Sequence, residues 1–129
     1  MAKSSGRKQP PKNLRTRTGP EAKIQQALID FLKIRDWGVK ETHGNLYQSG
    51  FPDLYAYHCR YGTRWIEVKV KGKYKFTGAQ LETFPDFSAK NVGIWILVAA
   101  TEAEYEKLFG PAQWHTFLDV MKVNSRLRI

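Results

Sequence analysis

The sequence predicts an α/β fold in which helices flank a mixed β-sheet, and three observations carry this prediction. Apolar residues recur at helical spacing between residues 24 and 32. Residues 54–57 and 65–70 are apolar and aromatic runs on either side of a turn, which is typical of a β-hairpin. Residues 93–98 form a continuous apolar run, the pattern of a central strand covered on both faces, after a connection long enough to hold a helix. The predicted order is helix, three strands, helix, strand, helix.

The first helix is expected to begin near Thr18, because Thr18 and Glu21 have the spacing of a capping box and Pro20 is tolerated in a first turn. It is expected to end near Asp36, with Gly38 as the stop signal. Glu21 extends the apolar stripe of this helix at its first turn. The stripe itself consists of Ile24, Ala27, Leu28, Phe31 and Leu32.

Local signals predict the strands that follow. Residues 39–47 are expected to include a short strand, although their polar middle shows no clean apolar alternation. Residues 48–50 are expected to form a turn, and the turn of the hairpin is expected at residues 61–63.

Three helical segments are expected after the hairpin. A basic loop at residues 71–75 leads into a helix over residues 77–91, in which Pro85 predicts a kink or a restart. A further helix over residues 101–109 has a Thr-x-x-Glu start and a Gly-Pro stop. A short helix-like piece follows at residues 117–122.

The composition is that of one globular domain, with 129 residues, of which 42% are hydrophobic and 13% are aromatic. We expect residues 1–17 to be a flexible basic arm and residues 18–129 to be a single domain. No apolar run is long enough to span a bilayer, and the N-terminus lacks the apolar segment of a signal peptide. We therefore expect no membrane partner and a cytoplasmic location, in a cell or in the host of a phage. The single cysteine, Cys59, suits a reducing compartment and excludes a Cys-rich zinc site.

The net charge of +9 at pH 7 is concentrated in two stretches. Residues 1–19 contain no acidic residue and hold Lys3, Arg7, Lys8, Lys12, Arg15 and Arg17. The second stretch holds Lys69, Lys71, Lys73 and Lys75. A polyanion such as DNA is the natural partner of this charge, and the alternative is a basic surface that only aids solubility.

The hairpin contains three groups that an ordinary strand does not need: Asp53, Glu67 and Lys69. Glu67 and Lys69 are two residues apart, so on a strand they share one face, and Asp53 approaches them from the neighbouring strand. Two carboxylates and a lysine are suited to a hard divalent cation that handles phosphate.

Three short motifs resemble those of the PD-(D/E)xK nuclease superfamily: Gly-Phe-Pro-Asp at residues 50–53, Ile-Glu-Val-Lys at 66–69, and Thr-Gly-Ala-Gln at 77–80. Together with a leading helix that carries an early glutamate, they are most similar to the small VRR-NUC domains and to Holliday-junction-resolvase-like nucleases. The resemblance covers roughly residues 20–100. It implies a restriction-endonuclease-like core, and Pro85 departs from the regular helix expected there.

The resemblance also implies a role for each matching residue. Asp53 and Glu67 would bind Mg²⁺, for which Mn²⁺ would substitute, and the main-chain carbonyl of Val68 would be a further ligand. Lys69 would be the catalytic lysine. Glu21 would match the helix glutamate of the metal site, and Gln80 the glutamine that opens the following helix.

Each of these residues also has an ordinary structural explanation. Asp53 could be a turn residue, and Glu67 and Lys69 could form a solvated strand face. Glu21 could serve only as a helix cap, and Gln80 could be a polar residue of an early helical turn. The lysines of the basic loop, which are Lys71, Lys73 and Lys75, could contact phosphate or be merely solvated.

The leading functional prediction is a Mg²⁺-dependent DNA endonuclease that acts on branched or otherwise structured DNA. Lys71, Lys73, Lys75, Arg15 and Arg17 would contact the DNA. The alternatives are a sequence-specific homing or restriction-type endonuclease and a non-catalytic DNA-binding module. A ribosomal or RNA-binding basic protein would not explain the paired carboxylates, because carboxylates repel phosphate unless a cation lies between them. A domain this small that makes two nicks would be a symmetric homodimer.

Overall fold

The computed structural model describes residues 19–42, 49–72 and 74–117. The predicted basic arm, residue 73 and the predicted helical piece after residue 117 lie outside these ranges. The predicted α/β class and element order are confirmed. The elements are α1 (Pro20–Ile34), β2 (Gly38–Glu41), β3 (Leu54–His58), β4 (Gly62–Val68), α2 (Gly78–Ala89), β5 (Ile94–Leu97), α3 (Glu102–Glu106) and the 3₁₀ turns η3 (Lys107–Phe109) and η4 (Trp114–Phe117).

The four strands form one mixed sheet in the order β2-β3-β4-β5. β2 and β3 pair antiparallel, β3 and β4 form the predicted antiparallel hairpin, and β4 and β5 pair parallel through the α2 crossover. The hairpin register pairs Leu54 with Ile66, so the residue before β3, Asp53, lies beside Glu67. The register therefore brings the two predicted carboxylates to the same end of the hairpin.

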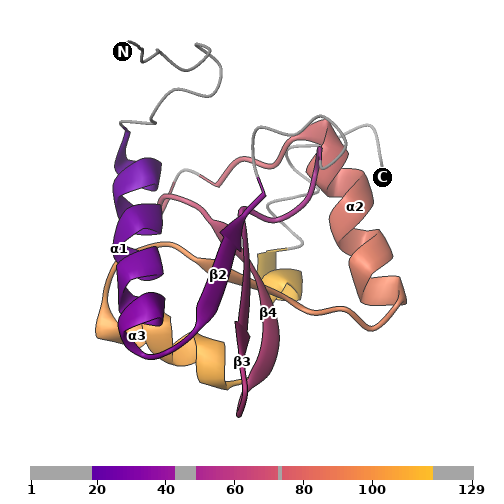
Figure 1. Cartoon of the computed structure of the whole chain (residues 1–129). Coiled ribbons are helices and arrows are strands. Elements are labelled where there is room, and N and C mark those ends of the chain that lie inside the picture. Colours follow the sequence, from indigo (N-terminus) through magenta and orange to yellow (C-terminus); the bar gives the residue numbers. More distant parts are fainter. Residues whose placement is uncertain (1–18, 43–48, 73, 118–129) are drawn as a thin grey trace, which may run out of the picture.

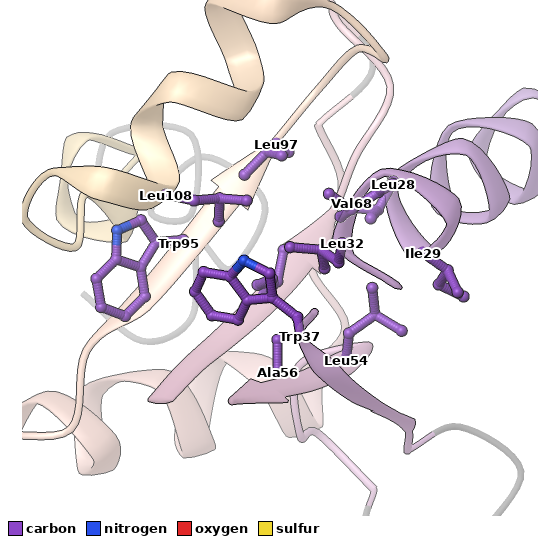
Figure 2. Packing of buried hydrophobic residues seen from close by; sticks show 11 residues of the cluster. Leu28, Ile29, Leu32, Trp37, Leu54, Ala56, Val68, Trp95, Leu97 and Leu108 are labelled. Carbon is purple, nitrogen blue, oxygen red and sulfur yellow. The ribbon is translucent and has the colours of Figure 1, made fainter. Parts of the chain in front are cut away.

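Helices cover both faces of the sheet (Figure 1): α1 and α3 lie on one face and α2 lies on the other. The core on the α1 face contains Leu28 and Leu32 from α1, which pack on Leu54 and Ala56 of β3 and on Val68 of β4 (Figure 2). The core on the α2 face joins α2 and η4 to β5, and its buried members are Phe76, Phe84, Ile94, Ile96, Val98 and Trp114. Alternation along β4 therefore sends Ile66 and Val68 to the α1 core, and Trp65 and Glu67 to the α2 face.

The start and end of α1 differ from the prediction. Gly19, and not Thr18, is the N-cap, and glycine has no side chain with which to form the predicted capping box. Thr18 itself lies outside the described residues. The N-cap falls at Gly19 because of Pro20, whose ring forces the preceding residue into the extended conformation that Gly19 adopts, with ψ −177°. At the other end, Asp36 takes the left-handed conformation with φ 72°, and Gly38 is not a helix stop but the first residue of β2. A side chain at Gly38 would collide with the ring of Tyr57, since a Cβ there would lie 2.0 Å from that ring.

Pro85 predicted either a kink or a restart of the second helix, and the restart does not occur. α2 runs unbroken from Gly78 to Ala89. Proline has no N–H to donate to the carbonyl one turn earlier in the helix. Because Pro85 is exposed, water can bond to that carbonyl instead. Phe84 is fully buried and Phe87 packs against the same core, which keeps the two halves of the helix in line.

The apolar strand β5 is buried along its whole length, as predicted, but among the strands of the described residues it lies at the edge of the sheet and is not central. The side chain of Gln113 takes the place of a neighbouring strand. Its Oε1 accepts from the Ile96 N–H at 3.1 Å, and its Nε2 donates to the Ile96 carbonyl at 2.6 Å. An apolar run alone cannot distinguish a central strand from an edge strand that a side chain and a 3₁₀ segment cover.

The predicted third helix is confirmed in outline. Thr101 is its N-cap and accepts from the Glu104 N–H, and η3 continues it to Phe109 before Gly110. Among the described residues, no helix has both the length and the apolar content needed to cross a bilayer.

Candidate active site

One pocket, with a volume of about 480 Å³, is lined by all five residues predicted to be catalytic. Asp53 directly precedes β3, Glu67 lies near the end of β4, and Lys69 directly follows β4. Glu21 reaches the pocket from the first turn of α1, and Gln80 from the first turn of α2. The pocket therefore joins three segments of the sequence at one end of the sheet.

The two carboxylates are locked together through the main chain of the hairpin. The Asp53 N–H donates to Glu67 Oε1 at 3.2 Å, and Asp53 Oδ2 accepts from the Val68 N–H at 2.8 Å. Each carboxylate is thus fixed by the strand that carries the other. Because the bond from Asp53 crosses the hairpin to a residue 15 positions away, Asp53 is not merely a local turn residue.

Lys69 is held on several sides. Its Nζ lies 3.1 Å from Glu67 Oε2, 2.6 Å from the Lys75 carbonyl oxygen and 3.2 Å from Gln80 Oε1. The ring of Phe76 lies under the same ammonium, with its centroid 4.6 Å from Nζ. Glu67 is 2% exposed and Lys69 is 6% exposed, so the explanation of these two residues as a solvated strand face is wrong.

Gln80 has two roles. Its N–H and its Oε1 complete a capping box with Thr77, which makes it part of the helix start. Its Nε2 donates to Glu67 Oε2 at 2.8 Å. Gln80 therefore connects the start of α2 to both Glu67 and Lys69, which a surface polar residue would not do.

Burial, and after it the neighbouring charge of Asp53, raises the pKa of Glu67 from 4.5 to about 8. Lys69 and Gln80 act in the opposite direction, because both stabilise the ionised carboxylate. A second positive charge at this position would favour ionisation, and a divalent cation is such a charge. The donor set fits Mg²⁺, which takes oxygen ligands and commonly uses one or two carboxylates while keeping several waters.

Glu21 lines the pocket but does not complete a cluster of metal ligands. No group of three or more His, Cys, Asp or Glu side chains within residues 19–42, 49–72 and 74–117 could hold a metal ion. The two hairpin carboxylates are therefore the primary candidates for ligands. The Val68 side chain is buried in the α1 core, and the Val68 N–H donates to Asp53 Oδ2. The main-chain carbonyl is therefore the only group of Val68 that would bind a metal.

Thr42 supports the site and has no signal in the sequence that would reveal this. It is 5% exposed, and its N–H donates to the Asp53 carbonyl at 2.9 Å. Its hydroxyl donates to the carbonyls of Pro52 and Asp53. These bonds extend the pairing of β2 with β3 by one residue and fix the main chain that carries Asp53. Gln25, one turn after Glu21, is a second buried polar residue, and it donates to Glu41.

The residues predicted to bind DNA are only partly described. Lys71 and Lys75 are exposed, and Lys75 also lines the pocket. Lys73, Arg15 and Arg17 lie outside the described residues. The loop therefore brings at least one exposed ammonium to the rim of the pocket that holds the carboxylates.

Comparisons of this chain with models of protein families, with curated proteins and with solved structures found no match. The resemblance to the PD-(D/E)xK nucleases therefore stays a prediction from the motifs.

The raised pKa of Glu67 predicts how stability changes with pH. The folded-state pKa of about 8 lies above the ordinary 4.5, so the stabilisation from the protonated carboxyl is complete below about pH 4.5 and is lost as the pH rises through 8. Glu67→Gln cannot ionise. In EDTA, we compare the melting temperatures of the two proteins. We expect the difference, variant minus wild type, to increase by several degrees between about pH 5 and pH 9. Thermal unfolding of both proteins across this range tests the assignment, and parallel curves would contradict it.

Proposed function

We propose that the protein is a Mg²⁺-dependent endonuclease that hydrolyses phosphodiester bonds in DNA, with branched or otherwise structured DNA as its substrate. The observation that supports this most strongly is the meeting of Asp53, Glu67, Lys69 and Gln80 in one pocket. Lys69 Nζ lies 3.1 Å from a carboxylate oxygen of Glu67, whose own position is fixed by Asp53. The burial of Glu67 and Lys69 also weighs against a non-catalytic DNA-binding module, which has no need of a buried carboxylate facing phosphate.

Asp53 and Glu67 would hold the metal, together with the Val68 carbonyl. A bound Mg²⁺ supplies charge neutralisation at the phosphate and a more acidic water. Lys69 keeps one position because Glu67, Gln80 and the Lys75 carbonyl all accept from its ammonium. A preorganised ammonium of this kind orients a nucleophilic water or stabilises the charge that develops on the phosphate. Gln80 prevents Glu67 and Lys69 from moving independently, since it bonds to both.

A cleavage assay tests this proposal. The full-length protein is incubated with linear, flapped and four-way DNA of matched sequence, in Mg²⁺, in Mn²⁺ and in EDTA. We expect strand cleavage with either metal, none in EDTA, and a preference for one of the structured substrates. Cleavage of linear DNA at a single sequence would favour the sequence-specific endonuclease. If no DNA is cut while DNA binding persists, the non-catalytic module becomes the better proposal.

The basic arm is proposed to bind phosphates without reading sequence. Deletion of residues 1–17 should weaken DNA binding and reduce its dependence on salt, by roughly 0.9 in the slope of log affinity against log salt for each phosphate that the shortened protein no longer neutralises. Cleavage at saturating DNA and low salt should stay near the full-length rate. Titrations at several salt concentrations measure the slope, and an unchanged slope would show that the arm does not bind DNA.

A further inference from the structure

Five aromatic side chains form a continuous row on the α2 face of the sheet, and we refer to Tyr57, Tyr55, Trp65, Phe51 and Phe87 as the aromatic row. Neighbouring ring centroids in this order lie 5.7, 4.6, 5.6 and 5.5 Å apart. Trp65 and Phe87 also contact each other directly, at 5.5 Å. Both Trp65 and Phe87 pack against the α2 core, so this end of the row is anchored.

Among the described residues, no core cluster covers the other end of the row. The core on the α2 face takes residues from β4 and β5 but none from β3. Tyr55 of β3 is half-buried, and Tyr57 is 40% exposed although its ring packs over Gly38. Figure 1 shows α2 on this side of the sheet, away from β2. The described part of the chain thus leaves the Tyr57 ring exposed and the Tyr55 ring partly exposed on this face of the sheet.

The aromatic row is continuous with the candidate active site. Tyr55 and Tyr57 alternate along β3 and share one face with Trp65 and Glu67 of β4, and Asp53 directly precedes β3 at the end of the sheet where Glu67 lies. Two residues along a strand are about 6.6 Å apart between their Cα atoms, and this backbone step separates Glu67 from Trp65. Lys40 pairs with Tyr55 across β2 and β3 and is exposed beside it. A ligand that occupies both the pocket and the row must therefore present a phosphate and flat rings in succession.

We propose that the aromatic row stacks unpaired nucleobases, so that the substrate is DNA with single-stranded nucleotides next to the phosphate that is cut. This inference rests on the proposed nuclease function and makes its substrate class narrower. Bases inside a duplex already stack on one another and cannot offer their faces to a tyrosine, whereas a flap, fork or single strand can. Aromatic rings beside basic side chains are the usual platform for single-stranded nucleic acid, where stacking tolerates any sequence.

Binding measurements in EDTA test the row without requiring cleavage. The full-length wild type and the variants Tyr55→Leu and Tyr57→Leu are titrated into a single strand, a forked duplex and a blunt duplex. We expect roughly five- to tenfold weaker binding of each variant to the single strand and the fork, and little change for the blunt duplex. Tyr57→Phe is the matched control, since it keeps the ring, and it should bind as the wild type does. A 2-aminopurine base in the unpaired arm should lose fluorescence on binding to the wild type and much less on binding to Tyr57→Leu.

The outcomes separate this inference from the proposed function. Thermal unfolding first shows that both leucine variants are folded. If the wild type cuts DNA and both variants bind and cut the fork as the wild type does, the stacking proposal is overturned and the nuclease proposal stands. If the leucine variants selectively lose single-strand binding while the wild type cuts nothing, the row binds bases and the nuclease proposal fails. If Tyr57→Leu instead converts a dimer into a monomer in sedimentation and leaves DNA binding unchanged, the face is an interface between two copies and the stacking proposal is overturned.

Discussion

Asp53→Asn and Glu67→Gln are each expected to lower the rate of DNA cleavage by about a thousandfold or more. The reason is the loss of a metal ligand, because the bound ion contributes several kcal/mol to charge stabilisation in the transition state and each 1.4 kcal/mol is about tenfold in rate. The structure adds a reason for such steep losses. Glu67 accepts a hydrogen bond from the Asp53 N–H, and Asp53 accepts one from the Val68 N–H. These bonds hold both side chains in place, so the remaining carboxylate cannot shift to replace the lost metal ligand.

DNA binding by these variants should be retained. In EDTA at neutral pH, Asp53→Asn should bind slightly tighter because a negative charge near the phosphate is removed, whereas Glu67→Gln should change affinity little because the pKa of Glu67 is about 8. Glu106→Gln is the matched control, since it removes the same charge from an exposed residue of α3 outside the pocket. Single-turnover cleavage and binding titrations on the same substrate separate the two effects. Cleavage at the wild-type rate by a folded Asp53→Asn or Glu67→Gln protein would refute the metal-site assignment.

Lys69→Met is expected to lower the cleavage rate by about a hundredfold to a thousandfold, the usual cost of removing one preorganised donor of an active site. Methionine keeps an unbranched apolar stem over Phe76 but removes the ammonium that bonds to Glu67, to Gln80 and to the Lys75 carbonyl. Binding of the divalent cation should survive, because Lys69 is not a ligand and its positive charge opposes that of the metal.

The pH of this measurement matters. Lys69 lowers the pKa of Glu67, so its removal leaves Glu67 more fully protonated at neutral pH, and metal binding must then displace more protons. Calorimetry at about pH 9, above the pKa of about 8 of Glu67 in the wild type, reduces the number of protons that the metal must displace. Lys75→Met is the control, since it removes an exposed ammonium from the rim of the same pocket and should affect DNA affinity more than the cleavage rate. Loss of metal binding by folded Lys69→Met would contradict the role given to this lysine.

The hairpin and its site could be predicted from the sequence because their signals are local. Period-two alternation put Glu67 and Lys69 on the face opposite Ile66 and Val68, and the hairpin brought Asp53 to the same end. Both features are found in the structure. Glu21 and Gln80 also line the pocket, but only the resemblance to a nuclease family connected them with it, since each lies on a helix whose orientation toward the sheet is a tertiary property.

Other features depend on contacts between distant segments and therefore leave no local signal. The burial of Gln25 and the bonds from Thr42 to the chain at Asp53 are of this kind. The start of α1 is a different case, because two local rules competed there. The spacing of Thr18 and Glu21 predicted Thr18 as the N-cap, whereas the restriction that Pro20 imposes on the preceding residue makes Gly19 the N-cap. Pro85 shows the reverse, since core packing of Phe84 prevailed over the local tendency of proline to break a helix.

The way Gln113 covers β5 bears on how copies of this protein can meet. An edge strand normally offers its main-chain N–H and carbonyl groups to any other extended chain, and sheets of two molecules can merge along such an edge. At Ile96 both groups are already bonded to one amide side chain, and the Val98 N–H is bonded to Glu104 Oε1. A second molecule that extended the sheet through β5 would first have to break these bonds. Merging of two sheets along β5 is therefore disfavoured, and the proposed homodimer would use another surface.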